Sequence, residues 1–214
     1  LGCTTALNFS ITQPAAMNVV FNGTPALCFN QASGTLQATA SGGTAPYNYQ
    51  WVSPAVSGNT ITNVLPGNYT VNITDNNGCA LSANGSVVSP LPLVATVTAL
   101  NDVSCNGGSD GNVQVGIVGG TAPYAIDWLT LAFDSVFVNN LSAGNYVAEV
   151  TDANACMATV VATISEPLPF TADLVVVSEE TCSNGNGSAF CSVNGGIGVL
   201  NYVWTPNVST TNLA

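Results

Sequence analysis

The sequence repeats itself at an interval of 77 residues, and this repeat constrains the fold more than any other feature. The phrase GGTAPY occupies residues 42–47 and returns at residues 119–124. The same offset relates seven more pairs of residues, which are Cys28 and Cys105, Trp51 and Trp128, Gly67 and Gly144, Tyr69 and Tyr146, Asp75 and Asp152, Cys79 and Cys156, and Pro90 and Pro167. Because self-similarity at a fixed period marks a repeat architecture, each period is predicted to form one structural unit.

The period divides the sequence into four segments. These are the tail of a preceding repeat (1–14), repeat A (15–90), repeat B (91–167) and the N-terminal part of a truncated repeat C (168–214). Cys3 lies eleven residues before Pro14, as Cys79 lies before Pro90. We therefore expect the sequence to be a window on a longer array.

Short segments within each copy alternate apolar and polar residues with a period of two, as in NYTVNITD at residues 68–75. This alternation predicts half-buried strands, and Gly-, Pro- and Asn-rich turns separate them. The fold class expected is all-β, with tandem immunoglobulin-like antiparallel β-sandwich repeats. The Pro-x-Pro segments at residues 90–92 and 167–169 disfavour helix, so the repeats are expected to follow one another end to end.

Conserved spacing also places aromatic residues within each copy. Trp51 and Trp128 resemble the buried tryptophan of an immunoglobulin-like domain, and Trp204 is their counterpart in repeat C. Tyr69 and Tyr146 follow PGN and AGN turns, which resembles a tyrosine corner. We expect these side chains to form the core, and the alternative is a platform for stacking sugars.

The cysteines recur in register, with one pair in each complete copy. Cys28 and Cys79 are separated by 51 residues, as are Cys105 and Cys156, which predicts the disulfides Cys28–Cys79 and Cys105–Cys156 in an oxidising compartment. Three cysteines are predicted to be unpaired within this window, namely Cys3, Cys182 and Cys191. For Cys191 we expect a small buried hydrophobic side chain, and the alternatives are a reactive thiol or a bridge to Cys182.

Charge excludes several classes of partner. The sequence has 11 acidic residues and no Lys, Arg or His, which gives a formal net charge of −11. No basic patch is available for nucleic acid or anionic lipid, and no apolar run reaches the 18 residues of a membrane span. Without His or Lys, the common nucleophile–base pairs and phosphate-binding loops cannot form, so we expect no enzymatic activity.

Two weaker patterns carry chemistry. Asp75 and Asp152 recur before the last turn of each copy, where an Asp normally accepts backbone N–H bonds. The alternative is a Ca²⁺ site built from these carboxylates and neighbouring carbonyl groups, although the dense Asp pattern of an EF-hand loop is absent. No other cofactor is expected. Ser135, in the triplet Asp134-Ser135-Val136, resembles a bacterial O-glycan acceptor.

The combined motifs resemble the SprB repeat of large surface adhesins in gliding Bacteroidota. They are CFNQASGTLQATASGGTAPYNYQW with LPGNYTVNITDNNGC in repeat A, and CNGGSDGNVQVGIVGGTAPYAIDW with LSAGNYVAEVTDANAC in repeat B. Repeat C departs from the pattern because GGIGVLNYVW lacks the Thr-Ala-Pro element. The resemblance implies export to the cell surface by type IX secretion and a role as the stalk or filament of an adhesin used in gliding motility.

The expected function is therefore structural: a repeat segment of a large extracellular filament or adhesin that supplies reach and stiffness for attachment. Its expected partners are neighbouring repeats of the same chain, with other filament strands or surface glycans as further possibilities. Two alternatives remain, an array of glycan-binding modules and the subunit of a head-to-tail extracellular polymer joined by strand addition. A secreted hydrolase acting through carboxylates ranks behind both.

Overall fold

The computed structural model describes residues 2, 5–181, 185–205 and 213. Over these residues the protein consists of strands, turns and extended segments, and it contains no helix. It follows that no described segment is a helix long and apolar enough to cross a membrane. All named strand pairs are antiparallel, so the all-β immunoglobulin-like fold class predicted from the sequence is confirmed.

Two compact units make up the structure. Unit 1 contains residues Leu1–Leu93 together with Gly119–Pro123 and Asp152–Cys156. Unit 2 contains Val94–Val118, Tyr124–Thr151 and Met157–Ala214. Unit 1 therefore holds repeat A together with two short loops that belong to repeat B in the sequence.

Unit 1 forms two three-stranded sheets. The first has the order β1-β2-β4, with β1 at Asn18–Thr24, β2 at Gly34–Ser41 and β4 at Thr60–Val64. The second has the order β3-β5-β6, with β3 at Asn48–Trp51, β5 at Gly67–Thr74 and β6 at Ala80–Val87. Buried side chains from both sheets form a common core, which gives a small β-sandwich.

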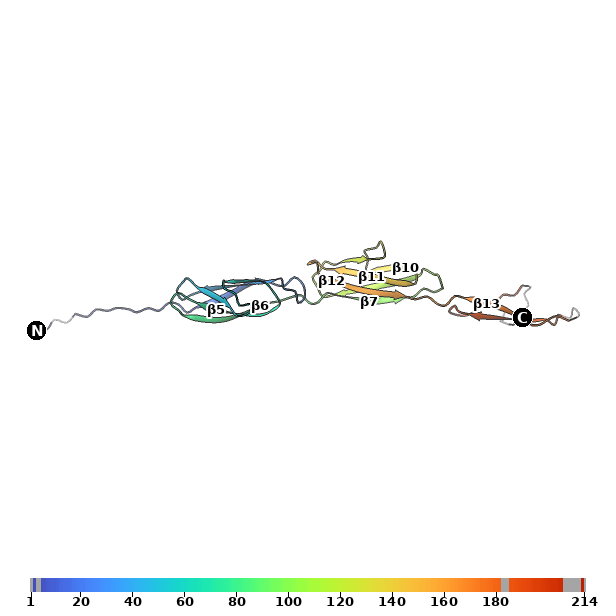
Figure 1. Ribbon diagram of the computed structural model, residues 1–214, viewed down its shortest axis with the longest axis horizontal. Coiled ribbons are helices and arrows are strands. Elements are labelled where there is room, and N and C mark those ends of the chain that lie inside the picture. Colours follow the sequence, from blue (N-terminus) through green and yellow to red (C-terminus); the bar gives the residue numbers. More distant parts are fainter. Residues whose placement is uncertain (1, 3–4, 182–184, 206–212, 214) are drawn as a thin grey trace. The chain divides into compact units, whose positions relative to one another are not determined.

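Unit 2 repeats this topology strand for strand (Figure 1). One sheet has the order β10-β8-β7, with β7 at Val94–Asn101, β8 at Gly111–Val118 and β10 at Phe137–Leu141. The other has the order β12-β11-β9, with β9 at Ala125–Trp128, β11 at Gly144–Thr151 and β12 at Met157–Ile164. A hairpin of β13 (Thr171–Ser178) and β14 (Ser188–Asn194) forms a separate two-stranded sheet.

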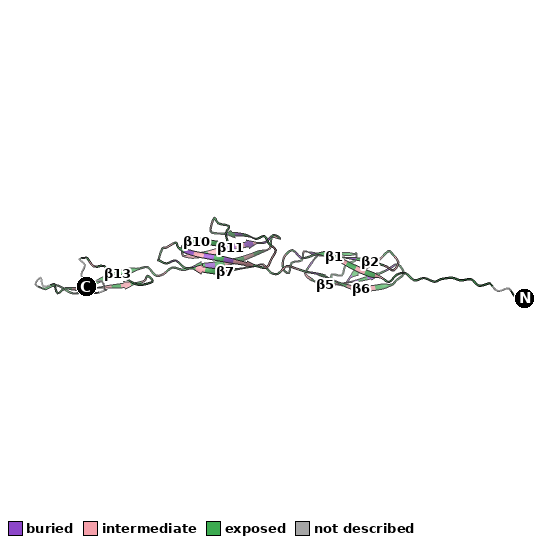
Figure 2. Ribbon diagram, turned by 180° about the vertical axis from the view of Figure 1, so that it is seen from behind, coloured by how far each residue is buried: buried purple, intermediate pink, exposed green. Residues whose placement is uncertain are grey.

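The core positions of repeat A recur one period later in repeat B. The buried core of repeat A consists of Leu36, Ala38, Trp51, Ile61, Val64, Val71, Ile73 and Val87. The residues 77 positions later are also buried, and they are Val113, Val115, Trp128, Val138, Leu141, Ala148, Val150 and Ile164. Purple, buried stretches accordingly lie among β7, β10 and β11 in Figure 2. Strand alternation explains the pattern, because every second residue faces the opposite sheet.

The tryptophans occupy the centre of both sandwiches. Trp51 is fully buried and Trp128 is 1% exposed. Each indole N–H donates to a backbone carbonyl, at 3.0 Å to Gly58 O and at 2.9 Å to Ser135 O. A buried indole therefore keeps its one polar group satisfied, which makes a large aromatic tolerable at the core.

Repeat C differs because the described residues provide only one sheet. Strand β13 is exposed at all eight positions, and Leu174 is 64% exposed. Trp204, predicted from the sequence to be a core aromatic, is half-buried. The apolar run at residues 174–177 of β13 is exposed and faces no second sheet in the described part of the chain.

The core arrangement predicts the effect of removing one tryptophan. Trp128→Ala should lower the free energy of unfolding of repeat B by about 3–5 kcal/mol, because it leaves a cavity at the centre of a packed sandwich. Urea denaturation followed by circular dichroism measures this loss. Leu129→Ala is the matched control, since Leu129 is 58% exposed and its truncation should cost less than about 0.5 kcal/mol. Equal losses in the two variants would contradict the assignment.

Candidate functional site: the cysteine-bearing turns

The two glycines of the GG phrase contact the segment that enters each repeat. Gly42, Gly119 and Gly195 all have positive φ angles. A Cβ atom on them would lie 2.1, 1.9 and 2.0 Å from the carbonyl oxygens of Ala16, Pro92 and Pro169, respectively. The second glycine then donates its N–H to the same segment, as Gly120 does to Leu91 O at 2.9 Å. Only glycine satisfies both the backbone conformation and this close approach, which explains why the phrase recurs.

A buried aspartate joins the GG loop to the turn that carries the second cysteine. In repeat A, Asp75 Oδ2 accepts the N–H of Thr44 at 2.9 Å, and Oδ1 accepts the N–H groups of Asn77 and Cys79 at 2.9 and 2.8 Å. The carboxylate is 5% exposed. It therefore fixes both the loop at residues 42–47 and the backbone of the cysteine.

Repeat B contains the same arrangement. Asp152 Oδ2 accepts the N–H of Thr121 at 2.8 Å, and Oδ1 accepts those of Asn154 and Cys156 at 2.8 and 2.9 Å. Asp152 is also 5% exposed. Repetition of three bonds at the same atoms shows that the Thr-Asp element is a structural motif of each repeat.

The hydrogen bonds determine the ionisation of both aspartates. Burial by itself would raise the pKa of Asp75 and Asp152, since it disfavours the charged form. The N–H donors of the turn and of the GG loop outweigh burial, and the pKa of each carboxyl lies below its ordinary value. Both groups are therefore carboxylates at neutral pH.

The surroundings of these carboxylates consist of N–H donors. A Ca²⁺ ion requires six to eight oxygen ligands, whereas three N–H groups already surround each aspartate. The described residues contain no group of three or more His, Cys, Asp or Glu side chains arranged to hold a metal ion. Calcium binding at Asp75 or Asp152 stays a prediction from the sequence, and the geometry favours the turn-capping role.

A disulfide joins Cys28 to Cys156 in unit 1. The Cα atoms lie 5.7 Å apart, and the two cysteines are separated by 128 residues. Next to the bridge, Asn154 Nδ2 donates to Leu27 O at 3.0 Å. The first cysteine of repeat A is thus bonded to the second cysteine of repeat B.

This bond corrects the pairing predicted from the sequence. Neither Cys28–Cys79 nor Cys105–Cys156 forms; Cys79 and Cys105 are free and exposed, and Cys191 is free and half-buried. Cys3 and Cys182 lie outside the described residues. The observed separation is the predicted 51 residues plus one period of 77, so the pairing is shifted by one repeat.

The physical reason is the position of the two cysteines along a strand. Cys28 follows the end of β1, whereas the turn of Cys79 binds the loop at Thr44, beside the entry to β1. Seven residues of extended strand separate these ends by about 23 Å. A disulfide requires Cα atoms within about 7 Å, so the two cysteines of one repeat cannot bond in the folded sandwich.

The remaining predicted residues have clear positions. The hydroxyl groups of Tyr69 and Tyr146 donate to Leu65 O at 2.5 Å and to Ser142 O at 2.9 Å, four residues upstream, which is the hydrogen bond of a tyrosine corner. Ser135, the predicted glycan acceptor, is exposed, and its Oγ accepts the N–H of Phe137 at 3.3 Å. Glycosylation at this serine stays a prediction.

One functional residue was missed by the sequence reasoning. Asn154 binds the carbonyl next to the disulfide and also Thr121 Oγ1 at 3.2 Å. Its counterpart Asn77 stands at the same position two residues before a cysteine. The recurrence of this asparagine was the available signal, although the partner could not be read from it.

The fold and these turns define the class of protein, a tandem array of immunoglobulin-like repeats with cysteine-bearing turns. The family model described as SprB repeat matches residues 20–56 and 97–133, two segments whose starts are one period apart. This match confirms the resemblance of repeats A and B to the SprB repeat. No curated protein sequence matches the chain significantly.

Solved structures share the fold at low sequence identity. The three N-terminal domains of the bacteriophage RB49 highly immunogenic outer capsid protein are 17% identical, with a TM-score of 0.51, and the match covers 86% of this chain and 71% of that one. The C-terminal 282-residue fragment of intimin, solved with the intimin-binding domain of its translocated receptor, is 13% identical with a TM-score of 0.37. That match covers 76% of this chain and 67% of the intimin fragment. The first of these similarities supports the β-sandwich fold alone.

The lowered pKa of Asp152 predicts a pH-dependent contribution to stability. A carboxyl whose folded pKa is depressed stabilises the fold above its unfolded pKa of about 3.9, and this stabilisation is lost as pH falls through the folded pKa. Asp152→Asn should therefore unfold at lower urea concentration than the parent at pH 7, and the difference should shrink below about pH 4. The exposed Asp127→Asn serves as control. A difference independent of pH would contradict the role of the charged form.

The disulfide predicts how the chain responds to a single cut. Because the sequence has no Lys or Arg, Pro92→Arg creates a unique tryptic site in an exposed position. Digestion in urea should leave one band on a non-reducing gel and two after reduction, since Cys28–Cys156 bridges the cut. Val199→Arg is the control, because it releases a cysteine-free peptide without reduction. Two bands from Pro92→Arg before reduction would support pairing within repeats instead.

Proposed function

We propose that the chain is a structural repeat segment of a large secreted cell-surface filament or adhesin, in which it supplies reach and stiffness for attachment. The observation that carries the proposal is the disulfide between Cys28 of repeat A and Cys156 of repeat B. A bond between consecutive repeats does nothing for a binding or catalytic site inside one repeat. Such a bond does change which covalent bonds carry the load when a long chain is pulled.

The mechanical effect follows from covalent connectivity. When the chain is pulled from its ends, tension passes from Cys28 through the disulfide to Cys156, so the peptide between them cannot be extended. The bridged segment of 128 residues would otherwise lengthen by about 440 Å on full extension. A filament built in this way keeps its length under loads that would stretch an uncrosslinked array.

The chemistry of the repeated residues supports a structural role. The polar side chains that recur in both repeats bind the backbone of their own fold: Asp75 and Asp152 cap turns, and Tyr69 and Tyr146 bond to upstream carbonyls. We assign no catalytic residue. Function in this proposal arises from repetition and stability.

Two observations support an extracellular location. A structural disulfide persists in oxidising compartments, and the match to the SprB repeat suggests a cell-surface protein. We place the array outside the cell, at its surface. The family resemblance further suggests a gliding member of the Bacteroidota and export by type IX secretion.

A second candidate function is glycan binding, which a pocket in repeat A favours. The pocket has a volume of about 460 Å³ and is lined by Phe21, Asn68 and Asn84 among others. An aromatic ring beside two amides could recognise a sugar. The counterparts of Phe21 and Asn84 in repeat B are Thr98 and Val161, so the pocket is not a property of the repeat.

Deletion of the array from the cells that produce it tests the proposal. Antibody labelling of intact parent cells should show the repeats at the surface, and deletion of the array should reduce attachment to glass several-fold. Addition of the purified 214-residue chain to parent cells should leave attachment unchanged, because reach cannot be supplied in trans. Inhibition by the purified chain would favour glycan binding, and labelling only after cell lysis would contradict the proposal.

A further inference from the structure

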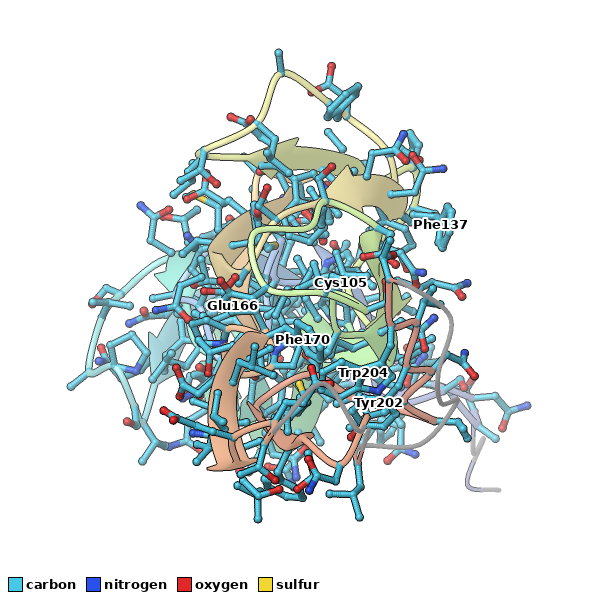
Figure 3. The ribbon with its side chains drawn as sticks, turned by 90° about the vertical axis from the view of Figure 1, so that its right-hand side faces the viewer. Cys105, Phe137, Glu166, Phe170, Tyr202 and Trp204 are labelled. Carbon is cyan, nitrogen blue, oxygen red and sulfur yellow. A yellow bond between two sulfur atoms is a disulfide. The ribbon has the colours of Figure 1, made fainter. Side chains whose placement is uncertain are left out.

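An open pocket adjoins the free thiol of Cys105 in unit 2. Its volume is about 440 Å³, and its lining includes Cys105, Asn106, Phe170, Gly196, Ile197 and Leu200. Figure 3 labels Cys105, Phe170 and Glu166, and of these Cys105 and Phe170 line the pocket. Gly107 N donates to Glu166 Oε2 at 2.7 Å and Asn106 Nδ2 to Pro167 O at 3.1 Å, so the loop of Cys105 is held in place.

The counterpart of this pocket in unit 1 is filled. Cys28 is the equivalent of Cys105, and the same unit contains the GG loop of repeat B, Gly119–Pro123, and the turn Asp152–Cys156. In unit 2 the GG loop of repeat C is present at Gly195 and Gly196. The 214 residues contain no counterpart of the turn Asp152–Cys156 for repeat C. The pocket thus has the first-cysteine loop and the GG loop of the filled site, with Ile197 in place of Thr121, and it lacks the second-cysteine turn.

The free thiol of Cys79 shows the complementary half of the same site. Cys79 is the equivalent of Cys156, and it lines a pocket of about 470 Å³ with Pro14, Met17, Gly43 and Asp75. This turn is already in its bonded conformation, since Asp75 holds it as Asp152 holds Cys156. What unit 1 lacks here is a counterpart of the Cys28 loop from a preceding repeat.

Asn77 and Asn154 differ in their hydrogen bonds, because only Asn154 lies beside a bonded cysteine. Both side-chain amides donate to a threonine Oγ1 of the GG loop, at 2.9 Å for Asn77 and 3.2 Å for Asn154. Asn154 donates in addition to Leu27 O, the carbonyl just before Cys28. The corresponding carbonyl for a turn docked beside Cys105 is that of Ser104, which also lines the pocket.

We propose that the pocket beside Cys105 is the docking site for the Thr-Asp-x-x-x-Cys turn of the next repeat in an array, and that docking ends in a disulfide from Cys105 to that cysteine. The two thiols lose two protons and two electrons to a disulfide-bearing oxidant, which is reduced to a dithiol. The asparagine of the docked turn donates to Ser104 O, and Phe170, Ile197 and Leu200 cover its apolar side. This inference depends on the cysteine pairing alone and not on where the protein acts.

If this pairing continues along the array, each peptide bond between bridged cysteines is spanned by at least one disulfide. The closed loop from Cys28 ends at Cys156, while the next loop already begins at Cys105, so consecutive loops overlap. A single cut anywhere then leaves both sides joined through a disulfide. Pairing within repeats would instead leave the segments between repeats, such as residues 80–104, without a bridge. The shifted register therefore protects an extracellular filament against proteolytic severing.

The test completes repeat C by appending a second copy of residues 139–167 after Ala214. Under oxidising refolding, Cys105 should bond to the added copy of Cys156 while Cys28–Cys156 is retained. Peptide mapping after Asp-N digestion identifies both bonds, because the added peptide ends at the copy of Pro167 and differs in mass from the native one. A bond from the added cysteine to Cys182, or a free Cys105, would overturn the proposal.

Two controls keep the result interpretable. In the parent chain Cys105 should be alkylated by a maleimide, and in the extended chain it should be protected. Disulfide mapping of the protein isolated from its own cells gives an answer that does not depend on the folding of the added segment. There Cys105 should be linked to a peptide outside residues 1–214, and a link to Cys156 would refute the shifted register. Unchanged attachment after deletion of the array, together with the expected map, would count against the proposed function alone.

Discussion

The buried carboxylate of each Thr-Asp turn holds together the parts on which the rest of the structure depends. Through three N–H bonds, Asp75 and Asp152 connect the GG loop to the backbone of the second cysteine. The GG loop in turn donates a backbone hydrogen bond to the segment that enters the repeat. One ionised side chain thus fixes where the chain enters a sandwich and where the cysteine that receives a disulfide is displayed.

The two sandwiches are stabilised by few kinds of interaction. Eight buried residues recur at a constant offset, and substitutions such as Leu36 to Val113 conserve apolar character while changing shape. The charged groups contribute no salt bridge because the sequence has no basic residue. Stability must therefore come from apolar burial, backbone hydrogen bonds and covalent bridging. Resistance to unfolding is the property on which the proposed structural role depends.

Much of the candidate site was accessible from the sequence. The repeated Asp75 and Asp152 were predicted to cap turns, and the structure shows three N–H bonds to each. The repeated GG was correctly predicted to be a turn. Its close contact with the carbonyl groups of Pro92 and Pro169 was not predicted, because the spacing of residues in a sequence does not show which backbone atoms approach a glycine in the fold. The disulfide partners were wrong for a related reason: a periodic sequence gives the same spacing pattern for every register of pairing.

The sequence by itself determined the period, the all-β class and the buried faces of the strands in repeats A and B. These properties depend on local alternation and composition, which are written along the chain. Only the tertiary structure decided which cysteines meet. A strand carries the first cysteine about 23 Å from the second cysteine of its own repeat, while folding brings it within 5.7 Å of one that is 128 residues away. Distance along a chain and distance in space are independent once strands run antiparallel, so the covalent connectivity belongs to the fold.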